Sequence, residues 1–265
     1  MAASWRPAAQ RSEERAAAGL SATNCGWDGA AVASLRSMKI TRVPDHLRQA
    51  LERPAPQSAF MWKPSAWIRQ MQDRPEVIAA LKSLPDRIDR DVVRQAVLRE
   101  LDGGRTFAAF VPAMVWGYGT SGRGPLRSRW VLTGNGTRSA GKYPVLASVA
   151  QHLEEGAAAA RTEGPLAGFR VMNNEARIKH LGPSFFTKWL YFASAVDSAI
   201  DHNAAPVFDM RVRDWIARHA RVSLRLNKTP DYSQYLDLLR AWGQPYDLSR
   251  VEVETEIFRL ATRRG

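Results

Sequence analysis

The spacing of apolar residues constrains this chain most, because they recur at helical intervals in one segment after another. Pro75 can begin a helix with an apolar face from Val77 to Leu84, and a second stripe from Val92 to Leu101 stops at Gly103. Similar patterns predict helices over 45–51, 106–116, 145–160, 168–180, 209–221, 230–242 and 249–262. The only β-like stretch is short, from Trp130 to Thr133. We therefore predict an all-α fold, with two helical lobes around a cleft.

Composition shifts divide the chain into three expected regions. Residues 1–40 read as an N-terminal extension, frayed or partly helical, in which Arg6, Arg11 and Arg15 are an alternative contact to a DNA backbone. The first 25 residues lack an apolar core, so a secretory signal is not expected. Residues 41–104 read as a helical region, and residues 105–265 as the core that carries the motifs described below.

A single cysteine, Cys25, excludes an intrachain disulfide framework, a cysteine-rich zinc site and a protein-held iron–sulfur cluster. The five histidines show no metal-ligand spacing, and no apolar run approaches the roughly 20 residues of a membrane span. The formal net charge is +12, with 38 Lys and Arg against 26 Asp and Glu. We therefore expect an anionic partner that carries phosphates.

The positive charge is concentrated in a stretch without acids. Between Asp102 and Glu154 there is no acidic residue, where the average of this chain gives about five. At its centre lies the glycine-rich segment 116–142, which we read as a connection that combines backbone access, arginines and aromatic rings for nucleic acid. The alternative is a surface loop with incidental charge. The arginines expected to contact DNA are Arg123, Arg127 and Arg129.

A second basic feature is the segment NNEARIKHLGPSFFTKWLYFA, residues 173–193. We expect one helix to end near His180, a tight hairpin at residues 181–184 in which Gly182 permits unusual dihedral angles, and a second helix that begins at Pro183. Free N–H groups at the start of that helix would form an anion site. Arg177 and Lys179 flank this site, so we predict that they contact a DNA phosphate there.

This segment resembles the helix-hairpin-helix motif of base-excision DNA glycosylases, in which a glycine-bearing hairpin precedes a helix that carries a catalytic lysine. A Pro-containing loop and an essential aspartate follow downstream, which here matches DHNAAPVFDMRV, residues 201–212. LGPSFFTKWLYFA and WGYG (residues 116–119) look especially similar to bacterial proteins of the 8-oxoguanine glycosylase (OGG) fold. The resemblance covers residues 105–262. Because the chain has a single cysteine, it cannot hold the iron–sulfur cluster found in one branch of these glycosylases.

The resemblance implies that Lys188 is the nucleophile of bifunctional members and Asp209 the essential carboxylate. It also implies a hairpin at Leu181, Gly182 and Ser184 that grips a phosphate, often with a monovalent cation on backbone carbonyls and with no other cofactor. One departure stands out: if Gly182 aligns with the last hairpin glycine, the usual lysine position falls on Ser184, one turn before Lys188.

The chemistry needs both groups. A carboxylate stabilises the positive charge that develops on the sugar, and a neutral lysine can attack C1′ and form a Schiff base. The alternatives are a lysine that snorkels from an apolar helix and an aspartate that only caps one; Asp197 and Asp201 could also compete with Asp209. Base flipping needs a pocket, for which the candidate lining residues, each equally readable as ordinary core, are Trp116, Tyr118, Phe110 and Trp189.

From these features we expect a DNA glycosylase that excises a modified base from double-stranded DNA. The substrate is either an oxidised purine such as 8-oxoguanine or a phage-modified base such as glucosylated hydroxymethylcytosine. The alternatives are a noncatalytic helix-hairpin-helix DNA-binding protein and an RNA-binding or scaffold protein that uses the arginine-rich stretch. We further expect a cytoplasmic, nucleoid-associated monomer with no membrane contact.

Overall fold

The computed structural model describes residues 42–55 and 57–262, which belong to one compact unit beginning at Ile40. The expected N-terminal extension, with Cys25 and its three arginines, lies outside the described residues. The unit is all-α apart from a two-residue antiparallel pair that joins Phe60–Met61 (β1) to Arg87–Ile88 (β2). The helices are α1 (Asp45–Leu51), α2 (Pro64–Gln70), α3 (Pro75–Lys82), α4 (Arg90–Asp102), α5 (Thr106–Tyr118), α6 (Gly124–Thr133), α7 (Ala147–Thr162), α8 (Pro165–Asn173), α9 (Pro183–Ser194), α10 (Met210–Ala220), α11 (Thr229–Gly243) and α12 (Arg250–Thr262), with short 3-10 turns at Ala140–Lys142 and Gln244–Tyr246.

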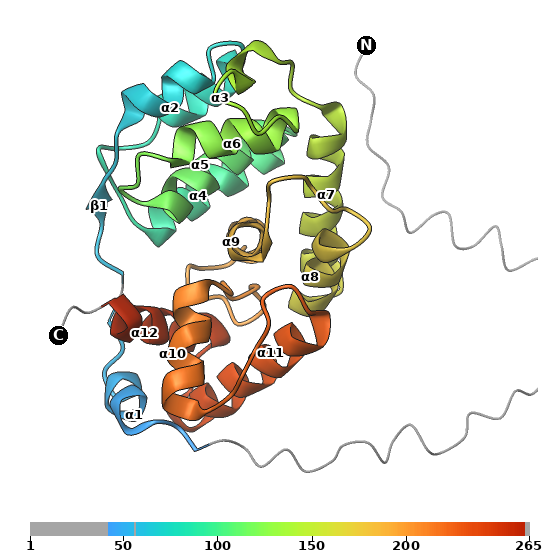
Figure 1. The fold of residues 1–265 in the computed structure, drawn as a ribbon. Coiled ribbons are helices and arrows are strands. Elements are labelled where there is room, and N and C mark those ends of the chain that lie inside the picture. The colour runs from blue at the N-terminus through green and yellow to red at the C-terminus, as the bar shows by residue number, and fades with distance from the viewer. Residues whose placement is uncertain (1–41, 56, 263–265) are drawn as a thin grey trace, which may run out of the picture. The chain divides into compact units, whose positions relative to one another are not determined.

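Two groups of helices flank α9 (Figure 1). On one side α3, α4 and α6 pack against α5, and on the other α1, α10 and α11 pack against α12. Helix α9 contacts α4, α5, α7 and α8. The helices α4 and α5, which flank residue 104, pack against each other inside this unit.

Two helices form the centre of the core because they are apolar on all sides. Every residue of α5 from Thr106 to Trp116 is buried, and so is every residue of α9 from Phe186 to Ser194. A helix that is apolar all round must be covered on every side. Pro112 lies inside α5, as its sequence position indicated. Lys188 is the charged residue among these buried positions of α9, and its surroundings are described below.

Two sequence expectations about local structure are wrong. Residues 130–133 are not β-like but belong to α6, which lies inside the segment we had read as a connection. In this segment Pro125 occupies the first turn of a short helix, and Gly134, with φ of 66°, ends it. The helix before the hairpin ends at Asn173, not near His180, and the Asn174 amide side chain there donates to the carbonyl of Arg170.

No helix among the described residues is long and apolar enough to cross a membrane.

Candidate active site

Lys188 lies inside the core on α9, with only 8% of its side chain exposed. Its Nζ donates a hydrogen bond of 2.6 Å to the carbonyl of Ser184 and lies 3.4 Å from Oδ2 of Asp209. The amine therefore reaches back one helical turn, to the backbone of Ser184. This geometry accounts for the departure in the hairpin alignment, because a lysine one turn later still brings its amine beside that position.

Asp209 holds two roles with its two oxygens. Oδ1 caps α10 by accepting from the backbone N–H groups of Arg211 and Val212, at 2.9 and 3.1 Å. Oδ2 faces Lys188. The capping reading and the catalytic reading of this residue are therefore compatible, since the cap leaves one oxygen directed at the amine. The rival Asp201 instead accepts from the N–H groups of Asp197 and Asn203 within its own loop.

Three buried hydrogen bonds fix the backbone before Asp209. The hydroxyls of Tyr232 and Tyr235 on α11 donate to the carbonyls of Pro206 and Val207, at 3.0 and 2.8 Å. The N–H of Phe208 donates to the hydroxyl of Thr187, which precedes Lys188 on α9. Because this last bond joins the two chain segments directly, the position of Asp209 relative to Lys188 is set by the backbone rather than by the ion pair.

Burial governs the protonation of the amine. Desolvation lowers the pKa of Lys188, while the neighbouring charges of Asp209 and Glu254 act in the opposite direction. The pKa of Lys188 is lowered overall, because the contact of 3.4 Å between Nζ and Oδ2 of Asp209 is long and the amine is almost wholly buried. A lysine with a lowered pKa has a larger neutral fraction, and the neutral amine is the nucleophilic form.

Gly117 makes room for the lysine chain. A Cβ atom added to Gly117 on α5 would come within 2.7 Å of Cδ of Lys188. No real Cβ tolerates such a contact, so any other residue here must displace the lysine. The first glycine of WGYG is therefore needed because the side chain of Lys188 packs directly against its backbone.

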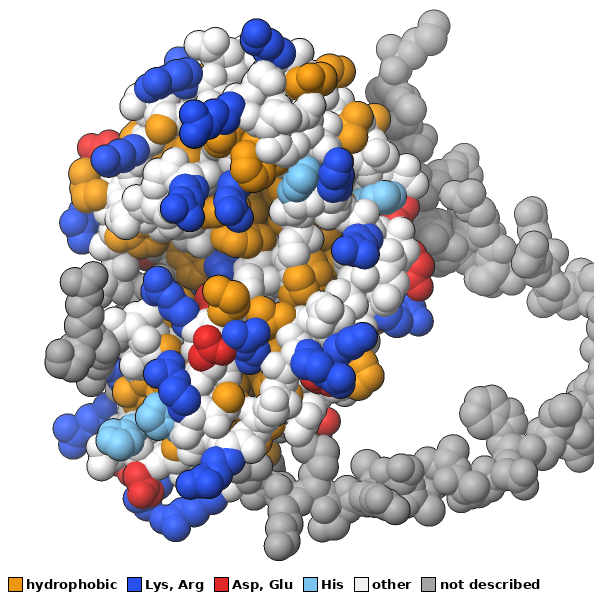
Figure 2. All heavy atoms as spheres, viewed as in Figure 1, with side chains coloured by type: hydrophobic (Ala, Val, Ile, Leu, Met, Phe, Trp, Pro, Cys, Tyr) orange, Lys and Arg blue, Asp and Glu red, His pale blue; other side chains and the backbone are white. Residues whose placement is uncertain are grey.

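The pair opens into a pocket of about 450 Å³. Figure 2 shows a hollow in this part of the molecule, with Lys and Arg side chains around it. Tyr118 and Phe185 form a stacked pair at one wall, with ring centroids 4.2 Å apart. The lining residues are Gln57, Phe60, Trp116, Gly117, Tyr118, Gly119, Thr120, Ser184, Phe185, Lys188, Val207, Asp209, Met210, Arg211, Glu254 and Phe258.

Two of the four predicted pocket residues are at this pocket and two are not. Trp116 and Tyr118 line it, and the indole of Trp116 donates to the side chain of Gln57. Phe110 and Trp189 are fully buried and pack against each other, with Nε1 of Trp189 bonded to the carbonyl of Leu153. The expectation that these two touch a base is wrong, because they belong to the core behind the site.

A second carboxylate, which no sequence motif indicated, lies at this pocket. Glu254 on α12 lines it, is 1% exposed, and accepts a hydrogen bond of 2.8 Å from Nη2 of Arg90 on α4. Desolvation raises the pKa of Glu254, and the charge of Arg90 opposes that shift. The two residues are 164 positions apart, so no local motif could have paired them.

The hairpin forms a groove of about 750 Å³ beside the start of α9. Its exposed residues include Arg177, Lys179 and Gly182, whereas the side chain of Leu181 is buried at 5% exposure. Leu181 can therefore offer only its backbone to a ligand. The left-handed residue is His180, with φ of 67°, and not Gly182, whose φ is −86°.

Gly182 does not adopt the unusual dihedral angles that we predicted, but its lack of a side chain leaves space before α9. A Cβ atom placed there would meet nothing within 4 Å, so the space in front of α9 is open. The N–H of Ser184 has no hydrogen-bond acceptor among the described residues. The N–H groups of Phe185 and Phe186 both donate to the carbonyl of Gly182, so a single free helix N–H, flanked by Arg177 and Lys179, faces this open space and suits an anion.

The basic stretch reaches this hairpin, but not all of its arginines are free. Arg123 and Arg127 are exposed, and the rings of Trp130 and His180 lie 5.9 Å apart, which places α6 next to the hairpin turn. The prediction that Arg129 contacts DNA is wrong. Its side chain is 1% exposed, pairs with both oxygens of Asp73 and donates to the carbonyl of Tyr143. Its guanidinium is fully engaged inside the protein and does not face DNA.

Among residues 42–55 and 57–262, no group of three or more His, Cys, Asp or Glu is placed to hold a metal ion.

Comparison with known families explains this arrangement. Residues 53–258 match the profile of the family described as "OGG: Putative 8-oxoguanine DNA glycosylase OGG-like protein". The chain belongs to this family. The match of the OGG-like family includes the lysine, the aspartate, the hairpin and both members of the Arg90–Glu254 pair. It also crosses residue 104 and includes α2, α3 and α4, whereas α1 lies before it. Comparisons with curated proteins and with solved structures gave no match.

Proposed function

We propose that this OGG-like protein is a DNA glycosylase that holds a flipped, modified base in the pocket beside Lys188 and cleaves its N-glycosidic bond. The observation that carries the proposal is the buried Lys188–Asp209 pair at the wall of a pocket next to an exposed basic hairpin. A noncatalytic DNA-binding protein needs the hairpin but not the pair. Burying a lysine against a pocket is costly for stability, and catalysis gives a reason for it.

The proposed reaction begins with the neutral amine. Lys188 attacks C1′ of the sugar while the bond from C1′ to the base breaks, and the departing base takes the electron pair and then a proton. The amine gives up a proton, and opening of the sugar ring leaves a Schiff base between Nζ and C1′. Oδ2 of Asp209 stabilises the positive charge on the sugar during bond cleavage. If water attacks instead, the same carboxylate orients it.

The hairpin supplies the grip on DNA in this proposal. The start of α9 and the side chains of Arg177 and Lys179 bind a backbone phosphate, and Arg123 and Arg127 extend the contact. The carbonyls of Lys179, His180 and Leu181 accept no hydrogen bond from the described residues, so they fit the monovalent cation that the resemblance implies. Such a cation would add positive charge beside the phosphate.

The pocket walls support the proposed substrate class. The stacked rings of Tyr118 and Phe185 offer a flat apolar surface, while Asp209 presents an acceptor for an N–H group of a base. We propose an oxidised purine such as 8-oxoguanine as the first candidate. A phage-modified base such as glucosylated hydroxymethylcytosine is the second, because the pocket lining includes the exposed Thr120 and Gly119, where an added Cβ atom would meet nothing within 4 Å, so a sugar substituent has room there.

The decisive experiment is base release. The purified protein is incubated with duplexes that contain 8-oxoguanine, with phage DNA rich in glucosylated hydroxymethylcytosine, and with unmodified DNA, and the released bases are measured by mass spectrometry. Parallel reactions contain borohydride to trap a Schiff base. Release from one modified DNA supports the proposal and names the substrate. Binding without release from every DNA overturns it in favour of a noncatalytic binder, and release without trapping assigns the attack to water.

A further inference from the structure

Behind the pocket lies a buried ion pair that no motif indicated. Arg90, at the first position of α4, is 7% exposed and bonds Glu254 on α12. Its guanidinium lies over the rings of Trp116 and Tyr191, at 5.0 and 4.7 Å from their centroids. Nε and Nη1 of Arg90 are buried and have no hydrogen-bond partner among the described residues, so Glu254 is the carboxylate that pairs with this guanidinium.

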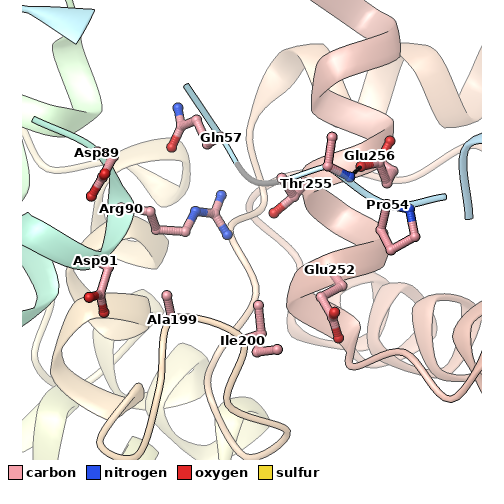
Figure 3. Close-up of a pocket in the computed structure, with 11 residues that line it drawn as sticks. Pro54, Gln57, Asp89, Arg90, Asp91, Ala199, Ile200, Glu252, Thr255 and Glu256 are labelled. Atoms are coloured by element: carbon pink, nitrogen blue, oxygen red, sulfur yellow. Dashed lines mark hydrogen bonds between the residues drawn. The ribbon is translucent and has the colours of Figure 1, made fainter. Parts of the chain in front are cut away.

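Arg90 does not line the pocket that Lys188 faces. It lines a second cavity of about 330 Å³, shown in Figure 3, where its side chain projects from the start of α4 into the space between residues 199–200 and α12. Gln57 borders both cavities. The guanidinium therefore contacts two residues of the pocket wall, Glu254 and Trp116, without lining the pocket itself.

Three buried charged groups and the partly buried Asp209 thus lie together, two of each sign. Lys188 and Asp209 form one pair and Arg90 and Glu254 the other. In a medium of low dielectric constant, each charge influences the other three. The charged or titratable side chains that line the pocket with Lys188 are Tyr118 on α5, Asp209 and Arg211 at the start of α10, and Glu254 on α12, with Arg90 of α4 behind; α7 and α8, which also pack against α9, contribute no residue to its lining.

We propose that Arg90 and Glu254 are positioning residues that set the protonation of Lys188. Arg90 holds the Glu254 carboxylate ionised and directed at the pocket wall, and its positive charge offsets the pull of the two carboxylates on the proton of Lys188. Neither residue attacks DNA. The inference rests on the proposed function, in which Lys188 acts as a neutral amine, and it assigns a role in the site to the region before residue 105.

The directions of the expected effects follow from charge alone. Glu254→Gln removes a negative charge that favours the protonated amine and leaves Arg90, which disfavours it, so the pKa of Lys188 should fall. Arg90→Met keeps an apolar chain between the two rings but removes the charge that holds Glu254 ionised, so Glu254 should take up a proton and the pKa of Lys188 should change less than in Glu254→Gln. The double variant likewise leaves both positions uncharged, so its value should match that of Arg90→Met. The loss of a charge within about 4–6 Å shifts a pKa by about one unit or more.

The experiment measures Lys188 without relying on base release. The full-length protein is labelled with trace acetic anhydride over a range of pH, and acetylation of the Lys188 peptide is measured by mass spectrometry. The midpoint of the labelling curve should move down by about one pH unit in Glu254→Gln and by less in Arg90→Met and in the double variant. Arg129→Met is the matched control, because it breaks a buried arginine–aspartate pair that does not border this pocket.

Two results would overturn the inference. One is a midpoint unchanged in folded Glu254→Gln, which also decides the matter if Arg90→Met does not fold. The other is an equal shift in Arg129→Met. A protein that releases no base from any DNA but shows the predicted shifts would refute the proposed function and keep the electrostatic coupling.

Discussion

Two buried cations in this molecule have opposite surroundings, and the difference separates structure from chemistry. Arg129 donates to both oxygens of Asp73 and to backbone carbonyls between Ala140 and Tyr143, so its guanidinium is saturated with acceptors. Lys188 has one short hydrogen bond and one long contact, and it faces a pocket. A saturated buried cation holds a fold together, whereas a poorly satisfied one beside a cavity is available for reaction.

The largest effect should come from the acceptor that Lys188 faces. Asp209→Asn removes the charge near the developing positive sugar but keeps a side chain that caps helices well, so the free energy of unfolding should change little. Base release should fall about 10²–10⁴-fold, as when a charged catalytic group is lost. The measurement is single-turnover base release, together with urea denaturation.

Asp89→Asn is the matched control, because Asp89 caps α4 in the same way and does not line the Lys188 pocket. It should retain full activity. Equal activity in Asp209→Asn and wild type would show that Asp209 is a cap only and would remove the contrast between the two buried cations.

The next effect tests the saturated cation. Arg129→Met leaves the carbonyls of Ala140, Gly141 and Tyr143 without a donor, while the half-exposed Asp73 regains water. The free energy of unfolding should drop by about 2–4 kcal/mol. Base release per folded molecule and the affinity for DNA should stay near those of wild type. A large loss of affinity in a stable variant would restore the DNA-binding role that the structure denies to Arg129.

The same contrast shows what a sequence can and cannot reveal. Lys188 and Asp209 were predictable because each follows a local signal, a hairpin with Gly and Pro in one case and a Pro loop in the other. Arg129 was misassigned because a count of charges in a stretch says nothing about which of them are buried. The all-α fold followed from apolar periodicity, while α6 was hidden by the glycines at its two ends. Arg90 and Glu254 meet only through tertiary packing across 164 residues, and each occupies an ordinary helix position.

A smaller effect should follow from crowding the lysine without changing any charge. Gly117→Ala places a methyl group against Cδ of Lys188 and must shift the amine. Base release and Schiff-base trapping should fall about tenfold or more, since a misplacement of about 1 Å can cost about 10²-fold. Stability should be nearly unchanged, because alanine favours the helix by about 0.5–1 kcal/mol and offsets the crowding.

Gly122→Ala serves as the control, because a Cβ atom there meets nothing within 4 Å. It should behave as wild type. Normal Schiff-base trapping in Gly117→Ala would contradict this prediction. It would show that the close packing of Gly117 against Lys188 is not needed for the reaction.

The smallest effect concerns a cation of a third kind, exposed and next to the hairpin. Arg177 is exposed and lines the hairpin groove, so its charge is available to a phosphate. Arg177→Ala should weaken DNA binding several-fold and reduce the slope of log affinity against log salt by about one, whatever the base in the pocket. Arg177→Lys keeps the charge and should preserve the slope. The measurement is fluorescence anisotropy with a labelled duplex at several salt concentrations. An unchanged slope in Arg177→Ala would show that the phosphate lies elsewhere, and exposure alone would then fail to distinguish a DNA contact from a solvated surface charge.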